Sequence, residues 1–351
     1  MNKIKDIEVL RAIAVTYTLI AHRYNLFFWE APYSNVFDHY FSFREGVDVF
    51  FVISGFVITK SLYPLLKNDK NRLQIIKQFW IKRIFRLAPS AWFWALITYA
   101  LGMCTLSQLS AALLNFMNVY EYIHNSATPV SHYWSLSLEE QFYLMIPLIF
   151  LLPFTAMKPI LLGLCVLQIL LHRPVGGSLW FVRSDALLLG VLMALTMEMN
   201  WRKKLNPIFL NNKILSWGAL IFLLMLLSIA GALNQGRYIW CGQGIVTLIA
   251  GCLVWVASFD KSYTMPNGYL KNTLVWVGAR SYAIYLVHPL CFTLMPAQWR
   301  FYGITPGLHE YLYTGYAIIF VGILSELNYR LIETPIRAFS SGIFIKESHH
   351  I

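Results

Sequence analysis

Ten long apolar segments follow one another along the chain, separated by short polar stretches. They lie at about residues 7–28, 46–65, 86–104, 135–153, 156–172, 182–199, 213–233, 238–258, 272–296 and 311–332. A helix needs about 20 mostly apolar residues to cross the hydrocarbon core of a bilayer, and the segments are close to that length. The pattern therefore predicts an all-α integral membrane protein with about ten transmembrane helices.

Nothing before, between or after these segments suggests a soluble domain. Residues 1–340 are expected to form a single transmembrane domain, followed by a short tail at residues 341–351. One stretch, residues 107–123, is too polar to span a bilayer but has the pattern of a helix. It is expected either to lie along the outer membrane surface or to serve as a connector.

Basic residues are distributed unevenly between the two sets of loops. With the N-terminus in the cytoplasm, twenty Lys and Arg residues, Lys271 among them, fall on the cytoplasmic side. Six, among them Arg44 and Arg173, fall on the opposite side. Because Lys and Arg are enriched in cytoplasmic loops, both termini and the tail are predicted to be cytoplasmic. The net charge of +11 is thus a topology signal, and nucleic acid is not expected as a partner.

The composition agrees with this class. Of the 351 residues, 58% are hydrophobic and 13% charged, whereas soluble proteins carry about a quarter charged residues. The five cysteines are scattered without CxxC spacing, which argues against a disulfide framework and a zinc site, and no metal is expected. The first apolar segment is too long for a signal peptide and is interpreted as an uncleaved span.

Two polar residues, Arg11 and His22, interrupt the first apolar segment. They are eleven residues apart, which at about 100° per residue places them on one face of a helix. Charged groups in a membrane segment normally face protein or a water-filled cavity. The alternatives are that Arg11 reaches the cytoplasmic headgroups and that His22 is a hydrogen-bonded core histidine.

Other polar groups fall toward the outer ends of different expected helices. They are Asp48, Glu139, Glu140, Arg183, Asp185 and His288. Each alone is compatible with a charge at a helix end. Together with His22, groups of similar depth from several spans predict one polar chamber that opens outward and is a candidate functional site.

The basic run at residues 77–90 lies at the inner boundary of the third segment, expected to be far in depth from Glu139. Lys77 and Lys82 are expected to contact anionic lipid. Arg83 and Arg86 are three residues apart, on one helix face. They are either further topology charges or a site for a phosphate-rich ligand, since guanidinium groups bind phosphate in a bidentate manner.

These residues belong to an ordered series of motifs. It consists of Arg-x10-His (Arg11, His22), GVDVFFVISGF (46–56), Arg-x-x-Arg (Arg83, Arg86), HYWSLSLEEQFY (132–143), RSDALLLG (183–190), SYAIYLVHP (281–289) and IETP (332–335). In this series the chain resembles the membrane acyltransferase-3 family, which includes bacterial O-antigen and exopolysaccharide O-acetyltransferases. Some members carry a fused SGNH hydrolase-like domain, and this chain resembles the stand-alone type.

The resemblance implies transfer of an acyl group, usually acetyl, from cytoplasmic acyl-CoA to a glycan hydroxyl, in the bacterial cytoplasmic (inner) membrane. The family's histidine matches His22 and its CoA-phosphate arginines match Arg83 and Arg86, with Arg11 in support. By family base rate, lipopolysaccharide O-antigen is the expected acceptor. Acylation of a non-polysaccharide acceptor is the alternative.

The expected chemistry centres on His22 as a general base that removes the hydroxyl proton. Glu139 or Glu140 is expected to orient the imidazole, and Arg183 to steady the oxyanion or hold the glycan. An acyl-histidine intermediate is the alternative route. Two rival functions remain at this stage: a transporter or flippase of lipid-linked sugar, and a non-catalytic sensor or assembly protein.

Overall fold

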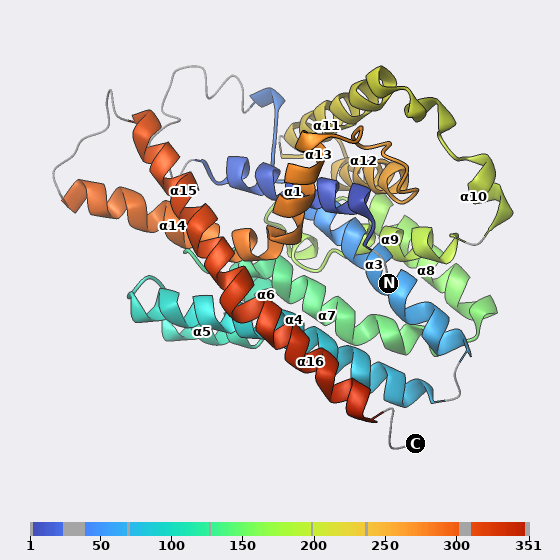
Figure 1. Cartoon of the computed structure of the whole chain (residues 1–351), viewed down its shortest axis with the longest axis horizontal. Helices are drawn as coiled ribbons and strands as arrows, with labels where there is room; N and C mark the ends of the chain where they lie inside the picture. The colour runs from blue at the N-terminus through green and yellow to red at the C-terminus, as the bar shows by residue number, and fades with distance from the viewer. Residues whose placement is uncertain are drawn as a thin grey trace. The chain divides into compact units, whose positions relative to one another are not determined.

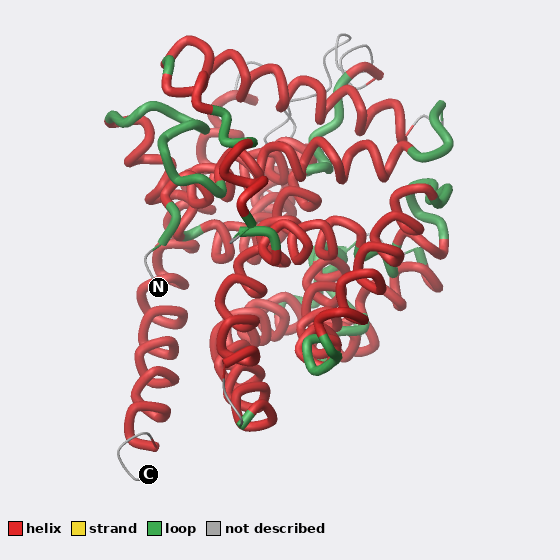
Figure 2. Tube along the Cα trace, turned by 90° about the vertical axis from the view of Figure 1, so that its right-hand side faces the viewer, coloured by secondary structure: helices red, strands yellow, loops and turns green. Residues whose placement is uncertain are grey.

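Helices make up the regular structure of the chain (Figure 1). The computed structural model describes residues 3–23, 39–68, 71–125, 128–197, 199–235, 238–301 and 310–347. Within these ranges the chain consists of helices and loops, with no strand (Figure 2). The all-α class expected from the sequence is confirmed for this part of the chain.

The first half of the chain contributes six labelled helices. They are α1 (Lys5–Ala21), α3 (Gly46–Asn68), α4 (Arg72–Ala100), α5 (Leu106–Leu113), α6 (Met117–His124) and α7 (Tyr133–Ile149). The first helices of the second half are α8 (Phe154–Leu170), the 3-10 turn η3 (Ser178–Trp180), α9 (Asp185–Leu195), α10 (Asn200–Lys204), the 3-10 turn η4 (Ile208–Asn211), α11 (Lys213–Gln235) and α12 (Gly242–Ala257). The last are α13 (Tyr269–Ala279), α14 (Ser281–Phe301), α15 (Glu310–Asn328), the π-helix η5 (Tyr329–Glu333) and α16 (Thr334–Glu347).

In the part of the chain that the structure describes, three helical stretches are long and apolar enough to cross a membrane by length and composition. They are Gly46–Lys67, Lys213–Gln235 and Thr314–Ser340. Shorter apolar helices occur at Phe154–Leu170, Asp185–Leu195, Gly242–Ala257 and Ser281–Leu294. Each of the ten expected segments falls on helical structure within the described residues, whereas the number of crossings and the side of the termini stay predictions.

The helix boundaries differ from the expected ones at several points. α1 ends at Ala21, just before the polar pair His22 and Arg23, and residues 24–28 of the first expected segment lie outside the described residues. The ninth expected segment is broken at Arg280 into α13 and α14. At the C-terminus, α16 continues to Glu347, so the predicted tail begins as a helix.

The stretch expected at residues 107–123 forms two short helices, α5 and α6. α5 starts at a capping box in which Thr105 accepts from the Gln108 backbone and Gln108 accepts from the Thr105 backbone. Asn115, with φ 58°, lies in the left-handed region between the two helices, a conformation that Asn tolerates better than most residues. The local sequence therefore explains why one expected helix becomes two.

The helices group into two compact units, each built from three separate segments. Unit 1 comprises Met1–Ala21, Ala31–Pro64 and Ile149–Ser281, and unit 2 comprises His22–Glu30, Leu65–Leu148 and Tyr282–Ile351. In unit 1, α1 packs on α12 and α13, and α12 also packs on α8, α9 and α11. In unit 2, α4 packs on α5, α16 and η5. The division therefore does not fall at a single linker.

Small residues allow α3 and α9 of unit 1 to touch backbone to backbone. A Cβ atom built on Gly55 would lie 2.0 Å from the Leu187 carbonyl oxygen, and one on Gly190 would lie 2.1 Å from the Val52 carbonyl oxygen. Helix pairs in membranes commonly use such contacts, because dispersion forces increase when backbones approach closely. The crossing leaves no room for a side chain at either glycine.

We therefore expect Gly55→Ala to lower the free energy of unfolding by about 1–3 kcal/mol, because the added methyl group forces the two helices apart. Gly218→Ala in α11 is the matched control, since nothing lies within 4 Å of its built Cβ and the change gains the same helix propensity. Thermal unfolding of the detergent-purified variants measures the difference. Equal midpoints for the two variants would contradict the close crossing.

Candidate active site

The polar residues singled out by the sequence divide between the two units. Unit 1 holds Arg11, Asp48, Arg183 and Asp185, and unit 2 holds His22, Arg83, Arg86, Glu139, Glu140 and His288. Unit 1 pairs Asp48 with Arg183, and unit 2 brings His22 beside His288. The single outward chamber expected for His22, Asp48, Glu139, Glu140, Arg183, Asp185 and His288 stays a prediction.

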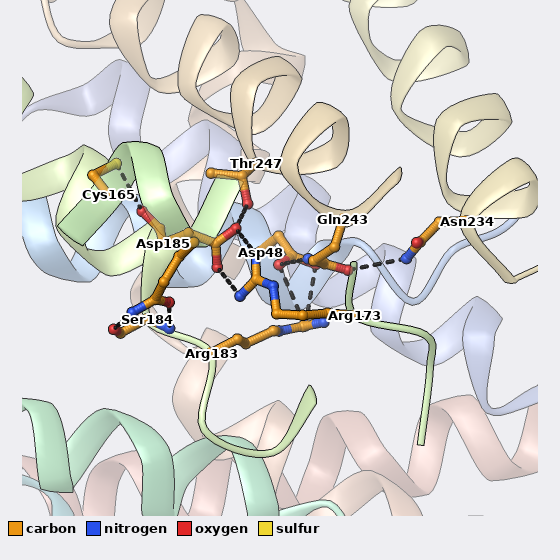
Figure 3. Close-up of polar contacts among 10 residues, drawn as sticks. Asp48, Cys165, Arg173, Arg183, Ser184, Asp185, Asn234, Gln243 and Thr247 are labelled. Carbon is orange, nitrogen blue, oxygen red and sulfur yellow. Dashed lines mark hydrogen bonds and ion pairs between the residues drawn. The ribbon is translucent and has the colours of Figure 1, made fainter. Parts of the chain in front are cut away.

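In unit 1, Asp185 forms a buried bidentate ion pair with Arg173 (Figure 3). Arg173 Nη1 and Nη2 lie 3.0 and 2.6 Å from the two carboxylate oxygens, and Thr247 Oγ1 donates to one of them at 2.6 Å. Both charged side chains are almost completely buried. Bidentate arginine–carboxylate pairs are strong and have a fixed geometry. Sequence reasoning counted Arg173 only as a topology charge and missed this role.

Asp48 forms the second buried pair, with Arg183 (Figure 3). Arg183 Nη2 lies 3.3 Å from the carboxylate, and Gln243 Nε2 donates to it at 2.8 Å. The guanidinium carbon of Arg183 lies 3.5 Å from the Trp180 ring centroid, a cation–π contact. The two pairs connect α3, α9, α12 and the loop before α9. The predicted role of these residues toward the acceptor stays a prediction.

The start of α9 is fixed by its neighbour α8, which explains why Asp185 points where it does. Gln168 of α8 accepts from the Ser184 backbone N–H at 2.7 Å and donates to the Ser184 hydroxyl at 2.9 Å. Asp185 is the first residue of α9 and Asp48 lies in the first turn of α3. Acidic groups at helix N-termini are stabilised by the helix dipole, so the local sequence favours both positions.

Arg11 of α1 lies beside the start of α14 within unit 1. Its Nε donates to Ser281 Oγ at 3.2 Å, and its Nη1 lies 3.8 Å from the Glu8 carboxylate. The Arg11 side chain is 20% exposed, in contrast to the fully buried Arg173 and Arg183. One helical turn earlier, Asp6 forms a buried ion pair with Lys271 at 2.6 Å. Lys271, counted as a topology charge, therefore has a structural partner.

In unit 2, the imidazole rings of His22 and His132 lie beside that of His288. His288 Nδ1 lies 2.8 Å from the Tyr285 carbonyl oxygen and 3.3 Å from that of Ile284, while its Nε2 lies 3.3 Å from His22 Nδ1. The centroid of the His132 ring is 5.6 Å from that of His288. His288 is fully buried. The structure thus brings together two histidines that the sequence placed in different spans.

His132 was quoted within a motif but not singled out as a site residue. Tyr285 Oη lies 3.0 Å from the His132 carbonyl oxygen, to which it donates, and 2.6 Å from Ser135 Oγ. Burial, reinforced by the neighbouring His22, lowers the pKa of His132 to about 3, so this ring stays neutral at physiological pH. Its place as the first residue of the HYWSLSLEEQFY motif was the available signal.

A polar face of α7 runs on from this imidazole group. Ser135, Glu139 and Tyr143 recur every four residues and so share one face of the helix. The Tyr143 hydroxyl donates to Glu139 Oε1, and the guanidinium carbon of Arg83 lies 5.0 Å from the Tyr143 ring centroid. Arg83 and Glu139 are also close enough to act electrostatically on Glu140.

The expected separation in depth between Arg83 and Glu139 is therefore wrong. The structure places Arg83 against Tyr143, one helical turn from Glu139. The reason is that α4 begins at Arg72, so that Arg83 lies well inside the helix rather than at its end. Arg83 and Arg86 are half-buried, whereas Lys77 and Lys82 are exposed. The arginines thus differ from the lysines in their surroundings.

Comparison with known proteins shows the family to which the chain belongs. The chain matches the family described as an acyltransferase domain over residues 4–326, nearly its whole length. The chain belongs to this acyltransferase-3 family. No solved structure matches the chain significantly.

Two relatives of this acyltransferase are proteins of Bacillus subtilis and Staphylococcus aureus. YrhL of Bacillus subtilis (strain 168), provisionally named a peptidoglycan O-acetyltransferase, is 28% identical over 341 residues, covering 86% of this chain and 52% of the relative. O-acetyltransferase OatA of Staphylococcus aureus (strain NCTC 8325 / PS 47) is 27% identical over 328 residues, covering 83% of this chain and 52% of the relative. The chain thus spans about half the length of the curated relatives it matches.

Within the described parts of this acyltransferase, no group of three or more His, Cys, Asp or Glu residues is arranged to hold a metal ion. The side chains of the two polar groups described above are imidazoles, carboxylates, guanidinium groups and hydroxyls. These are the groups used in general acid–base catalysis and in the binding of phosphate.

We expect Arg173→Met to destabilise the protein by about 3–5 kcal/mol, because it leaves the carboxylate of Asp185 buried without its countercharge. Arg44→Met is the matched control. Arg44 was assigned to the same side of the membrane from the sequence but is exposed, so its loss should change stability by less than about 0.5 kcal/mol. Thermal unfolding in detergent compares the two, and similar midpoints would show that the buried pair does not stabilise unit 1.

Proposed function

We propose that the chain is an O-acyltransferase of the bacterial cytoplasmic membrane that transfers an acetyl group from cytoplasmic acetyl-CoA to a hydroxyl group of a cell-surface polysaccharide. Membership of the acyltransferase-3 family and the names of its relatives support the type of reaction. The observation that carries the proposal is the polar face of α7. It connects the imidazole group, through Ser135 and Tyr285, with Arg83, through Glu139 and Tyr143.

In this proposal, both substrates bind along the polar face of α7 within unit 2. Eight residues separate Ser135 from Tyr143, which corresponds to about 12 Å along a helix. CoA phosphates bound at Arg83 and Arg86 would be linked to the thioester by the extended pantetheine arm. The arm can therefore carry the acyl group along α7 toward His22. Arg11, in unit 1, is proposed as a further basic contact for acyl-CoA.

The proposed chemistry is a single acyl transfer with His22 as the base. The imidazole removes the proton of the sugar hydroxyl as its oxygen forms a bond to the thioester carbonyl carbon. The carbon–sulfur bond then breaks, and the imidazolium returns the proton to the departing thiolate, which leaves as CoA thiol. An acyl-histidine route, in which His22 first takes the acyl group, is the competing order of steps.

The carboxylates and the unit 1 cluster have supporting roles in this proposal. The carboxyl groups of Glu139 and Glu140 lie near Arg83, and one of them is proposed to stabilise the positive charge that develops on the imidazole. Asp48, Arg183 and Asp185 are proposed to shape the acceptor side of the site. Since these three residues are already held in buried pairs, they act by geometry rather than by exchanging protons.

The proposed acceptor is a cell-surface polysaccharide, and two polymers are candidates. The family resemblance favours lipopolysaccharide O-antigen, whereas the name of YrhL specifies peptidoglycan. Expression of the chain in a host that makes both polymers, followed by mass spectrometry of each, separates the two. An added acetyl mass on one polymer identifies it as the acceptor. Absence of any acetylation that depends on the chain would refute the proposed function.

We expect His22→Ala to reduce acetylation by about 10²–10⁴-fold, the usual contribution of general-base catalysis. His172→Ala is the matched control, because His172 is an exposed histidine of unit 1 that bonds to the Trp240 carbonyl. Polysaccharide acetylation at matched membrane expression is the measurement. Near-normal acetylation in His22→Ala would remove His22 from the chemistry.

We expect Arg83→Ala and Arg86→Ala each to raise the dissociation constant for CoA by about 10- to 150-fold, because each removes a charge-assisted hydrogen bond. Lys77→Ala, from the exposed part of the same basic run, should leave the constant unchanged. Calorimetry with CoA on the purified proteins measures all three. An unchanged affinity in both arginine variants would leave the pair as topology charges only.

A further inference from the structure

The protonation of the His288 ring follows from its backbone contacts. Its Nδ1 lies 2.8 Å from the Tyr285 carbonyl oxygen and 3.3 Å from that of Ile284. Carbonyl oxygens only accept hydrogen bonds, so the hydrogen must be on Nδ1. His288 is fully buried, and burial without a countercharge favours the neutral form of an imidazole. The Nε2 of His288 is therefore an unprotonated acceptor.

This acceptor determines which nitrogen of His22 carries a hydrogen. His22 Nδ1 lies 3.3 Å from His288 Nε2. A hydrogen bond between these two atoms requires one donor, and only His22 Nδ1 can supply it. In the neutral ring of His22 the hydrogen is thus on Nδ1, and Nε2 carries the lone pair. The two rings meet edge to face, with centroids 4.9 Å apart and planes at 63°.

We propose that His288 is a positioning residue that holds His22 in the Nδ1–H tautomer and thereby makes Nε2 the catalytic base. The proposal rests on the proposed function, in which His22 removes the proton of the acceptor hydroxyl. It assigns to a buried imidazole the orienting role that the sequence assigned to Glu139 or Glu140. The described contacts of Glu139 include the Tyr143 hydroxyl, which places this carboxylate toward Arg83.

A neutral partner suits a base that must begin the reaction unprotonated. A carboxylate at the same buried position would stabilise the imidazolium before the substrate arrives, and so reduce the fraction of His22 that can accept a proton. Imidazole stabilises the resting tautomer without a formal charge. Once His22 has taken the proton, its Nδ1–H becomes a charge-assisted donor to His288 Nε2, and this bond strengthens.

The rings around His288 keep its acceptor in place. The Tyr285 carbonyl that binds His288 Nδ1 belongs to the residue whose hydroxyl contacts Ser135 and the His132 carbonyl. The His132 ring packs at 5.6 Å from His288, centroid to centroid. Rotation of His288 would break the backbone bonds and the contact to His22 together. The orientation of His288 is therefore determined by its own helix turn and by α7.

The first test measures the tautomer directly. Nitrogen NMR of protein labelled in its histidine rings distinguishes protonated from unprotonated ring nitrogens, and His22→Asn identifies the His22 signals. In the unchanged protein we expect His22 to have a protonated Nδ1 and an unprotonated Nε2. In His288→Phe, which keeps a ring but has no acceptor, we expect the population to move toward the Nε2–H form. His172→Phe, outside the cluster, should leave the His22 signals unchanged.

The second test separates positioning from packing by rescue. His288→Gln provides an amide oxygen that reaches the position of Nε2, so it keeps an acceptor for His22 Nδ1. With radiolabelled acetyl-CoA as donor and peptidoglycan glycan strands or O-antigen as acceptor, His288→Phe should lower kcat by about 10- to 150-fold. His288→Gln should stay within about 10-fold of the unchanged protein, and neither variant should alter KM for acetyl-CoA.

The outcomes keep this proposal distinct from the function on which it rests. A predominant Nε2–H tautomer in the unchanged protein, or His22 signals that do not respond to His288→Phe, would overturn the role of His288 even if His22 is essential. Full activity of His22→Ala would overturn the proposed function, while the NMR result would still decide whether His288 sets the tautomer. If His288→Phe does not fold, the unchanged protein and His288→Gln still give the tautomer.

Discussion

The constraint on which the structure depends is that a charge removed from water needs a countercharge beside it. Three such pairs lie in unit 1: Asp185 with Arg173, Asp48 with Arg183, and Asp6 with Lys271. Breaking a buried pair by removing one partner is much more costly than replacing both with apolar residues. Each pair therefore ties together the two segments that carry its members, and the backbone contact at Gly55 and Gly190 holds α3 and α9 close together.

The helices and the identity of the polar residues could be predicted because both depend on local sequence. Apolar length indicates the helices, and a charge inside an apolar segment is a candidate wherever it lies. The ion-pair and hydrogen-bond partners of these residues could not be predicted, since they depend on which helices pack together. Arg173 and Lys271 were taken as loop charges and proved to be buried partners of acids more than ten residues away. The break at Arg280 and the inward position of Arg83 likewise follow from packing and helix length.

The imidazole group of unit 2 is held together in another way. Around His288 the contacts are hydrogen bonds between neutral groups: a ring nitrogen to a backbone carbonyl, ring to ring, and tyrosine hydroxyl to serine hydroxyl. Groups that can carry formal charge lie further along α7, at Glu139, and on α4, at Arg83. A neutral cluster can be buried at lower cost than ions provided that its hydrogen bonds are made. It can also gain or lose a proton without the loss of an ion pair.

The contrast between the units bears on which residues can carry out chemistry. A group that changes charge during a reaction cannot be one whose charge holds the fold together, because its protonation would leave a partner buried and unbalanced. Asp185 and Asp48 are of this kind, and their arginines share the constraint. The imidazole of His22, bonded to a neutral acceptor, is not. In the proposed mechanism, proton transfer therefore belongs to the histidines of unit 2, whereas buried ion pairs hold Asp48 and Asp185 of unit 1 in place. The sequence alone presents both sets as equivalent polar residues in apolar surroundings.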